Sequence, residues 1–155
     1  MIYCLFYIVF ALLFASWLKF ELKKPVDIKK HLPWLIGPVL TGVLGWLVFS
    51  QSQTVTTNFV LHASGGVSVT FIYIYLIKTF DAQINWRLHL LLLFALVSML
   101  GVINEIAEYA VELAHLGTMA WDIHDTWRDL VANTVGAFSA WSVYCLLHWF
   151  HAKKK

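Results

Sequence analysis

Six of the nine acidic residues in this chain of 155 residues fall within one stretch of 25 residues, from position 105 to position 129. They form two series whose members stand three and then four residues apart, which is the spacing of one helical face. The first series is Glu105, Glu108 and Glu112, and the second is Asp122, Asp125 and Asp129. Each series therefore predicts a helix that carries a row of carboxylates along one side.

Carboxylates gathered in this way could hold a divalent cation, Mg²⁺ or Mn²⁺ if oxygen atoms alone are the ligands. His62 would shift the preference toward Zn²⁺, which takes an imidazole nitrogen readily. Paired carboxylates could also share one proton and serve as general acid and base. The sequence thus predicts either a divalent metal site for Mg²⁺, Mn²⁺ or Zn²⁺ or a proton-sharing pair.

The candidate residues are those whose carboxylate, imidazole or amide groups suit this chemistry. The candidate catalytic residues are His62, Glu105, Glu108, Asp125, Asp129 and Asn133. The candidate metal ligands are His62, Glu105, Glu108, Asp122, Asp125 and Asp129. Asn133 continues the row of aspartates by one helical turn, so its amide is expected to orient the site.

The composition places these residues in a membrane protein. Hydrophobic residues make up 60% of the chain and charged residues 13%, whereas soluble domains carry about 25% charged residues. Mean hydropathy is +0.71. These values exclude disordered chains, disulfide scaffolds and nucleic-acid-binding domains. We therefore expect membrane lipid as a partner and no nucleic acid.

Five apolar stretches approach the ~20 residues that a helix needs to cross the hydrocarbon core. They run at about 2–18, 33–50, 59–77, 88–112 and 128–150. The second is short and contains Pro38, so a tilt, a kink or a continuation into its flanks is expected. The fold class predicted is an all-α, polytopic transmembrane helix bundle that forms a single integral-membrane domain over residues 1–155.

Basic residues predict the orientation of this bundle. Ten of the eleven Lys and Arg residues lie in the loop after the first stretch, the loop after the third stretch and the C-terminal tail. Because Lys and Arg are enriched in cytoplasmic loops, the C-terminus is predicted to be cytoplasmic and the N-terminus outside. The acidic rows then lie on the outer side.

The same topology brings the candidate residues to one depth. His62 lies near the start of the third stretch, Glu105 near the end of the fourth and Asp129 near the start of the fifth. Ionisable groups at membrane depth are costly and face a bundle interior or a water-filled cavity. A polar cluster that merely pins the helices is the alternative, but so many acids favour a functional site. We expect His62 to lie within about 8 Å of Asp125 or Asp129, near enough for a shared ion or a bridging water.

Two sequence stretches resemble a known group of proteins. They are GVINEIAEYA…WDIHDTWRDLVANTVGA, with the acidic rows, and the upstream NFVLHASGG, with His62. Over about residues 58–140 they resemble the VanZ-like membrane proteins and, more closely, the YjdF-like group of small bacterial inner-membrane proteins. The resemblance implies a multi-pass protein of the bacterial inner membrane in the cell envelope, and for the VanZ-like proteins a role in low-level glycopeptide-antibiotic resistance.

These observations leave several functions open. The first is an acidic, metal-binding pocket on the outer-leaflet side that acts on a phospholipid or polyprenyl-linked headgroup. The second is non-catalytic binding of an envelope lipid or a cationic peptide, and the third is a proton-coupled or cation-coupled transporter. Small-residue faces at Gly37-x3-Thr41-x3-Gly45 and Ala132-x3-Gly136-x3-Ala140 predict helix packing within the chain or a homo-oligomer.

Overall fold

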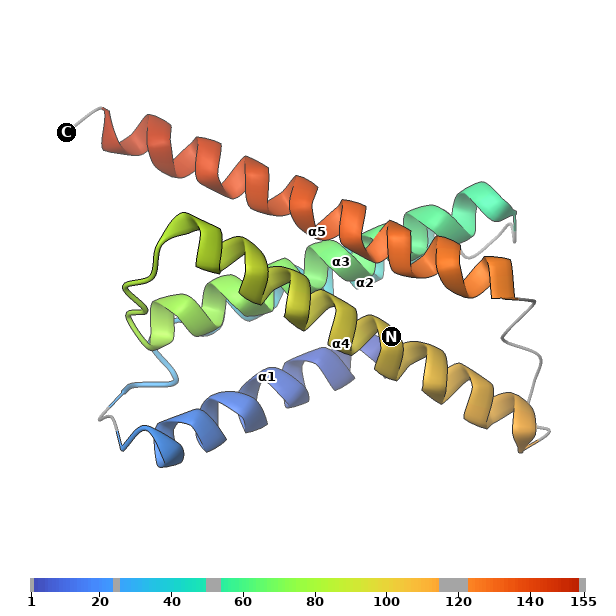
Figure 1. Cartoon of the computed structure of the whole chain (residues 1–155), viewed down its shortest axis with the longest axis horizontal. Coiled ribbons are helices and arrows are strands. Elements are labelled where there is room, and N and C mark those ends of the chain that lie inside the picture. Colours follow the sequence, from blue (N-terminus) through green and yellow to red (C-terminus); the bar gives the residue numbers. More distant parts are fainter. Residues whose placement is uncertain (1, 24–25, 50–53, 115–122, 154–155) are drawn as a thin grey trace.

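The computed structural model describes residues 2–23, 26–49, 54–114 and 123–153, and these residues form helices without any strand (Figure 1). Each of the five apolar stretches is helical over its described residues, which confirms the all-α class. The elements are α1 (Ile2–Glu21), the 3-10 helix η1 (Leu32–Leu35), α2 (Ile36–Phe49), α3 (Val55–Thr79), α4 (Trp86–Leu113) and α5 (Ile123–Ala152).

Three described helices are long and apolar enough to cross a membrane. They are α3, α4 and the segment Ile123–Phe150 of α5. Crossing by α1 and α2, and the orientation of the bundle, remain predictions from the sequence.

The second apolar stretch forms two short elements in place of one long helix. Pro33 lies in the first positions of η1, and Pro38 lies in the first turn of α2. Proline is tolerated there because the first amides of a helix have no intrahelical acceptor. The 14 residues of α2 reach ~21 Å at about 1.5 Å per residue, less than the ~30 Å hydrocarbon core. Proline position thus explains the short helix.

Helix α3 is the centre of the bundle and contacts α1, η1, α2, α4 and α5. It begins at Val55, earlier than expected, because Thr54 caps it. The Thr54 hydroxyl accepts a hydrogen bond from the Thr57 amide at 3.2 Å, and the Thr57 hydroxyl accepts one from the Thr54 amide at 2.8 Å. This capping box satisfies two amides that would otherwise lack partners. Asn58 is therefore helical and stands one turn before His62.

Helices α3 and α5 cross with their backbones in direct contact. A Cβ atom added at Gly66 would collide with the backbone of Asn133, and one added at Gly136 would collide with the backbone of Ala63. The Thr70 hydroxyl also donates a hydrogen bond to the Ala137 carbonyl oxygen at 3.0 Å. Glycine is needed at both positions because any side chain would separate the helices. The crossing holds His62 of α3 close to Asp129 of α5.

The second small-residue face, on α2, also packs against α3. A Cβ atom at Gly37 would collide with the Phe71 ring. The Thr41 hydroxyl lies 2.6 Å from the Ser68 hydroxyl. Both small-residue faces therefore pack within the chain, and the homo-oligomer remains an untested prediction.

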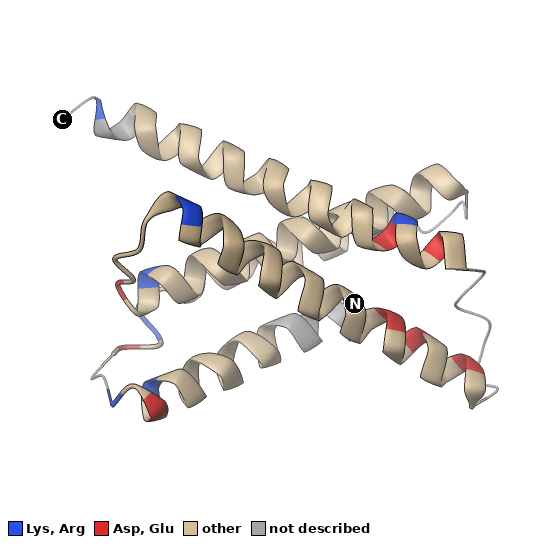
Figure 2. Ribbon diagram, viewed as in Figure 1, with Lys and Arg blue, Asp and Glu red and all other residues tan. Residues whose placement is uncertain are grey.

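Charged residues gather at the two ends of the bundle (Figure 2). Asp and Glu are concentrated at the C-terminal end of α4 and the N-terminal end of α5, together with Arg128, and a few more stand among the basic residues at the opposite end. The other Lys and Arg residues that the structure describes lie at the opposite end. We call these the acidic end, after Glu105 and Asp129, and the basic end, after Lys78 and Arg87. The segregation predicted from the sequence is present in the fold.

Candidate metal centre

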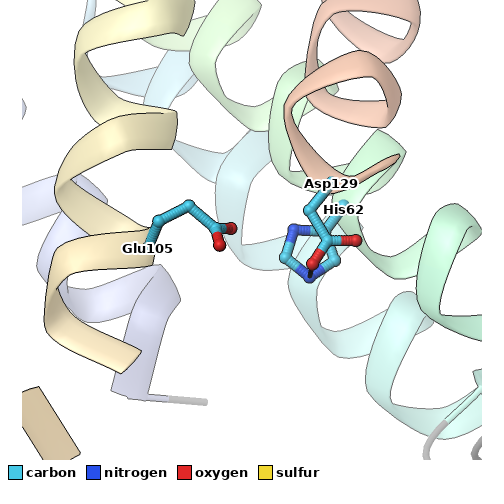
Figure 3. Close-up of side chains that lie close together, drawn as sticks. All are labelled: His62, Glu105 and Asp129. Carbon is cyan, nitrogen blue, oxygen red and sulfur yellow. Dashed lines mark ion pairs between the residues drawn. The ribbon is translucent and has the colours of Figure 1, made fainter. Parts of the chain in front are cut away.

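His62, Glu105 and Asp129 come together from three helices at the acidic end (Figure 3). Each offers one ligand atom, and these atoms all lie within 4.8 Å of one another. His62 Nε2 is 3.2 Å from Asp129 Oδ2. The expectation that His62 lies near Asp125 or Asp129 is therefore confirmed, and the group is a candidate site for a metal ion.

The His62–Asp129 pair is enclosed and held from a second side. The Asp129 side chain is 3% exposed and that of His62 is 15% exposed. The Asn58 amide nitrogen donates a hydrogen bond to Asp129 Oδ1 at 3.0 Å. Both Asp129 oxygens thus contact α3, since Asn58 and His62 stand one turn apart on the same face. This arrangement fixes the carboxylate and orients the imidazole.

Glu105 approaches the pair from α4, and its carboxylate points toward the imidazole ring (Figure 3). One turn earlier, a Cβ atom at Gly101 would lie 3.0 Å from Leu130 Cδ2, so α4 and α5 approach closely there. The Thr126 hydroxyl of α5 lies near the Glu105 carboxylate. The Oε1 atom of Glu105 is buried and has no hydrogen-bond partner among the described residues. A buried carboxylate oxygen without a donor is costly unless a cation or a proton satisfies it.

Asp125 borders the group and links it to a cation. The Asn58 amide nitrogen lies 3.4 Å from Asp125 Oδ1. The Arg128 guanidinium donates to the same oxygen at 3.2 Å, and its side chain is 40% exposed. Asp125 therefore connects the enclosed His62–Asp129 pair to a charged group near the surface.

Glu108 lies beside the group without entering it. Its Oε1 accepts a hydrogen bond from the Asn104 amide nitrogen at 2.7 Å. The carboxylates of Asp125, Glu105 and Glu108 all interact electrostatically with Asp129. Like charges this close destabilise one another unless a counter-cation or a proton is present.

The remaining candidates separate into three cases. Asn133 is buried one turn beyond Asp129, and its amide nitrogen lies 3.6 Å from where a Cβ of Gly101 would stand. Its amide therefore lies where α4 approaches α5, and its part in the site stays a prediction. Glu112 lies one turn beyond Glu108 on α4 and outside the group of ligand atoms. Asp122 falls outside the described residues.

Two residues of the cluster were absent from the sequence-based set. Asn58 bridges Asp125 and Asp129, and its position four residues before His62 is the signal that could have found it. Thr126 lies near Glu105, and its position three residues before Asp129, on the same helical face, is the signal that could have found it. Neither residue carries a charge or an imidazole, so the pattern of acidic and histidine side chains did not single them out.

The comparisons with known proteins concern nearly the whole chain. A family model described as "Predicted membrane protein (DUF2238)" matches residues 2–150. No curated protein and no solved structure matches the chain.

Proposed function

The chain belongs to the DUF2238 family of predicted membrane proteins, and from this premise we propose that it is a multi-pass inner-membrane protein of bacteria that binds a divalent cation between His62, Glu105 and Asp129. We further propose that the site acts on the phosphate group of a phospholipid or a polyprenyl-linked lipid. The observation that carries the proposal is the meeting of three ligand atoms from three separate helices within 4.8 Å.

The donor set fits a cation. Glu105 Oε1 is a buried oxygen that lacks a partner among the described side chains. Its neighbours supply one imidazole and one further carboxylate, a set that Zn²⁺ and Mn²⁺ accept. Three protein ligands leave coordination positions for water or substrate, as in catalytic sites. Mg²⁺ is less well matched, because it prefers oxygen ligands alone.

The protein side chains have distinct parts in this proposal. His62 and Glu105 would hold the ion, and Asp129 would complete the set while Asn58 fixes its orientation. A bound cation would neutralise charge on a phosphate oxygen of the substrate. Arg128, at the exposed edge, is placed to contact a second phosphate oxygen, because guanidinium groups bind phosphate well.

Metal binding is the first test. Purified protein is equilibrated with Zn²⁺ and, separately, with Mn²⁺, and the bound metal is measured for wild type, Glu105→Gln and Glu112→Gln. We expect Glu105→Gln to lose about tenfold or more in affinity, in the range seen when groups around a metal are altered. Glu112→Gln removes the same charge from the same helix outside the group, so it should bind as wild type does. Equal binding by wild type and Glu105→Gln would refute the site.

Action on lipid phosphate is the second test. Vesicles of phosphatidylglycerol and of a polyprenyl phosphate are incubated with metal-loaded protein, and release or transfer of the headgroup is followed. We expect turnover that a chelator abolishes and that Glu105→Gln lacks. Metal binding without any turnover would remove the reaction and leave the metal site standing.

Non-catalytic binding is the second candidate, and the bonding of the cluster favours it. Asp125, Asp129 and Glu108 already accept hydrogen bonds from Asn58, Arg128 and Asn104, as a rigid receptor for a cationic group would require. The resemblance to VanZ-like and YjdF-like proteins supports such an envelope role. Binding of a cationic peptide that survives chelation would favour this function over the metal enzyme.

Transport of protons or cations is less well supported. A coupled pathway needs ionisable groups along the depth of the bundle. Asp, Glu, Lys and Arg lie at the two ends in the part of the chain that the structure describes (Figure 2). The middle turns of α3, α4 and α5 carry none of them.

A further inference from the structure

Lys78, at the basic end, lies at the junction of three elements. It belongs to the last turn of α3, and its Nζ atom is 5.4 Å from the ring centre of Trp34 in η1 and 5.7 Å from that of Tyr144 in α5. The two rings meet edge to face with their centres 5.9 Å apart. Ring faces attract an ammonium group electrostatically. The aromatic pair therefore fixes the position of this cation.

Other cations at the basic end contact rings on their own helix. Arg87 lies over the ring of its neighbour Trp86, with 5.6 Å between the guanidinium carbon and the ring centre. Lys153 lies 3.8 Å from the ring centre of Trp149, one turn earlier on α5. Such contacts form wherever a long basic side chain folds along a helix. Lys78 differs because its rings come from two other elements, so the tertiary fold builds its surroundings.

Hydrogen-bond donors around Lys78 are unfilled. Among the described residues, no carboxylate lies within 4.0 Å of its ammonium group, which offers three N–H donors. In that same part of the chain, the indole N–H of Trp34 and the hydroxyl of Tyr144 also make no hydrogen bond to protein. These three groups therefore leave N–H and O–H donors to which an anion can bind.

We propose that Lys78, Trp34 and Tyr144 bind the phosphate of an anionic phospholipid in the leaflet at the basic end. Trp and Tyr concentrate at the level of lipid headgroups, and anionic lipids attract basic residues near that surface. A phosphate oxygen would accept from Lys78 Nζ, while the rings pack beside the glycerol and upper acyl chain. This lipid site is separate from the metal site, and neither depends on the other.

The test measures lipid retained by purified protein. Protein is reconstituted in phosphatidylcholine that contains phosphatidylglycerol, extracted gently, and the phosphatidylglycerol bound per chain is counted by native mass spectrometry. We expect Lys78→Met to weaken retention about tenfold, equivalent to ~1.4 kcal/mol. Lys153→Met is the matched control, since it removes the same charge from the same end, and it should retain lipid as wild type does. Lys78→Arg should bind, because a guanidinium also donates to phosphate.

Each other result overturns the proposal. Unchanged retention by Lys78→Met would remove Lys78 from lipid binding. Equal losses in Lys78→Met and Lys153→Met would show attraction to surface charge without a built site. Displacement of phosphatidylglycerol by inorganic phosphate alone would show a site for free phosphate. If Lys78→Met does not fold, as judged by helical circular dichroism, loss of lipid by the folded Lys78→Arg variant decides against the proposal.

Discussion

The two ends of α3 satisfy their polar groups in opposite ways. At the acidic end, His62 and Asn58 reach across to the carboxylate of Asp129 on α5. At the basic end, Lys78 lies against the rings of Trp34 and Tyr144. Carboxylates that face one another repel and are stabilised by a cation, whereas the ammonium of Lys78 is attracted to the ring faces beside it. The acidic end is therefore the end at which we propose a bound cation.

The basic end also contains a polar pair that is complete by itself. The Tyr73 hydroxyl lies 2.7 Å from His89 Nδ1, and the Trp141 ring packs edge to face against Tyr73. Two buried oxygens lack a hydrogen-bond partner among the described residues: Oε1 of Glu105 at the acidic end and the hydroxyl of Thr79 at the basic end. A satisfied pair stabilises a helix interface, whereas a buried carboxylate oxygen without a donor needs a cation or a proton more than a neutral hydroxyl does. The Tyr73–His89 pair therefore anchors the helices, whereas the Glu105 carboxylate is the group for which we propose a ligand.

The largest effect is expected from a substitution that forces α3 and α5 apart where their backbones touch. Gly66→Ala places a Cβ against the Asn133 backbone, which cannot move as a side chain can. We expect a loss of about 3 kcal/mol in the free energy of unfolding, at the upper end for overpacking. Unfolding in mixed detergent micelles measures it, and metal binding should fall as well because His62 moves from Asp129.

Gly45→Ala is the matched control for this variant. Its added Cβ would lie 3.1 Å from the Ser64 hydroxyl, the end of a small side chain that can adjust. A loss below ~1 kcal/mol is expected. Equal stability of the two variants would contradict the backbone contact.

A smaller effect is expected from removing the amide that bridges two aspartates. Asn58→Leu leaves Oδ1 of Asp129 without its donor, and the loss of a donor to a buried group costs about 1–3 kcal/mol. Asn104→Leu removes an amide whose bond to Glu108 lies within α4, and pairs within a helix contribute ~0.2–0.5 kcal/mol. Thermal unfolding should therefore rank Asn58→Leu as the more destabilised variant, and the reverse order would contradict the account.

The smallest effect is expected at the basic end. Tyr73→Phe removes the hydroxyl that contacts His89, at a cost of about 1 kcal/mol for one hydrogen bond. Metal affinity should not change, since the pair lies at the opposite end of α3 from His62. A fall in metal affinity with Tyr73→Phe would show that the two ends of α3 are coupled and would contradict their separate roles.

The helices and the main cluster could be predicted from the sequence because both depend on local spacing. Long apolar runs predict helices, and carboxylates three and four residues apart predict one face. The topology then placed His62, Glu105 and Asp129 at one depth. That part rests on periodicity and on the length of a membrane helix, which a single sequence contains.

The rest depended on contacts between helices. The spacing that put Asn133 on the aspartate row did not show that α4 approaches its amide nitrogen at Gly101. The early start of α3, set by the Thr54 cap, brought Asn58 into the site, although the apolar pattern began after it. The reciprocal contact of Gly66 and Gly136 required the crossing of α3 and α5. Which glycines contact the other helix depends on how the two helices pack, and the sequence of one helix alone does not determine that.

The most direct test of the central claim is pulsed electron paramagnetic resonance of Mn²⁺ bound to the purified protein. If His62 is a ligand, wild type should show modulation from one imidazole nitrogen, and His62→Ala should lose it. His124→Ala removes another histidine near the start of α5 and should keep the signal. Mn²⁺ that binds without nitrogen modulation, or modulation that persists in His62→Ala, would contradict a metal centre formed by His62, Glu105 and Asp129.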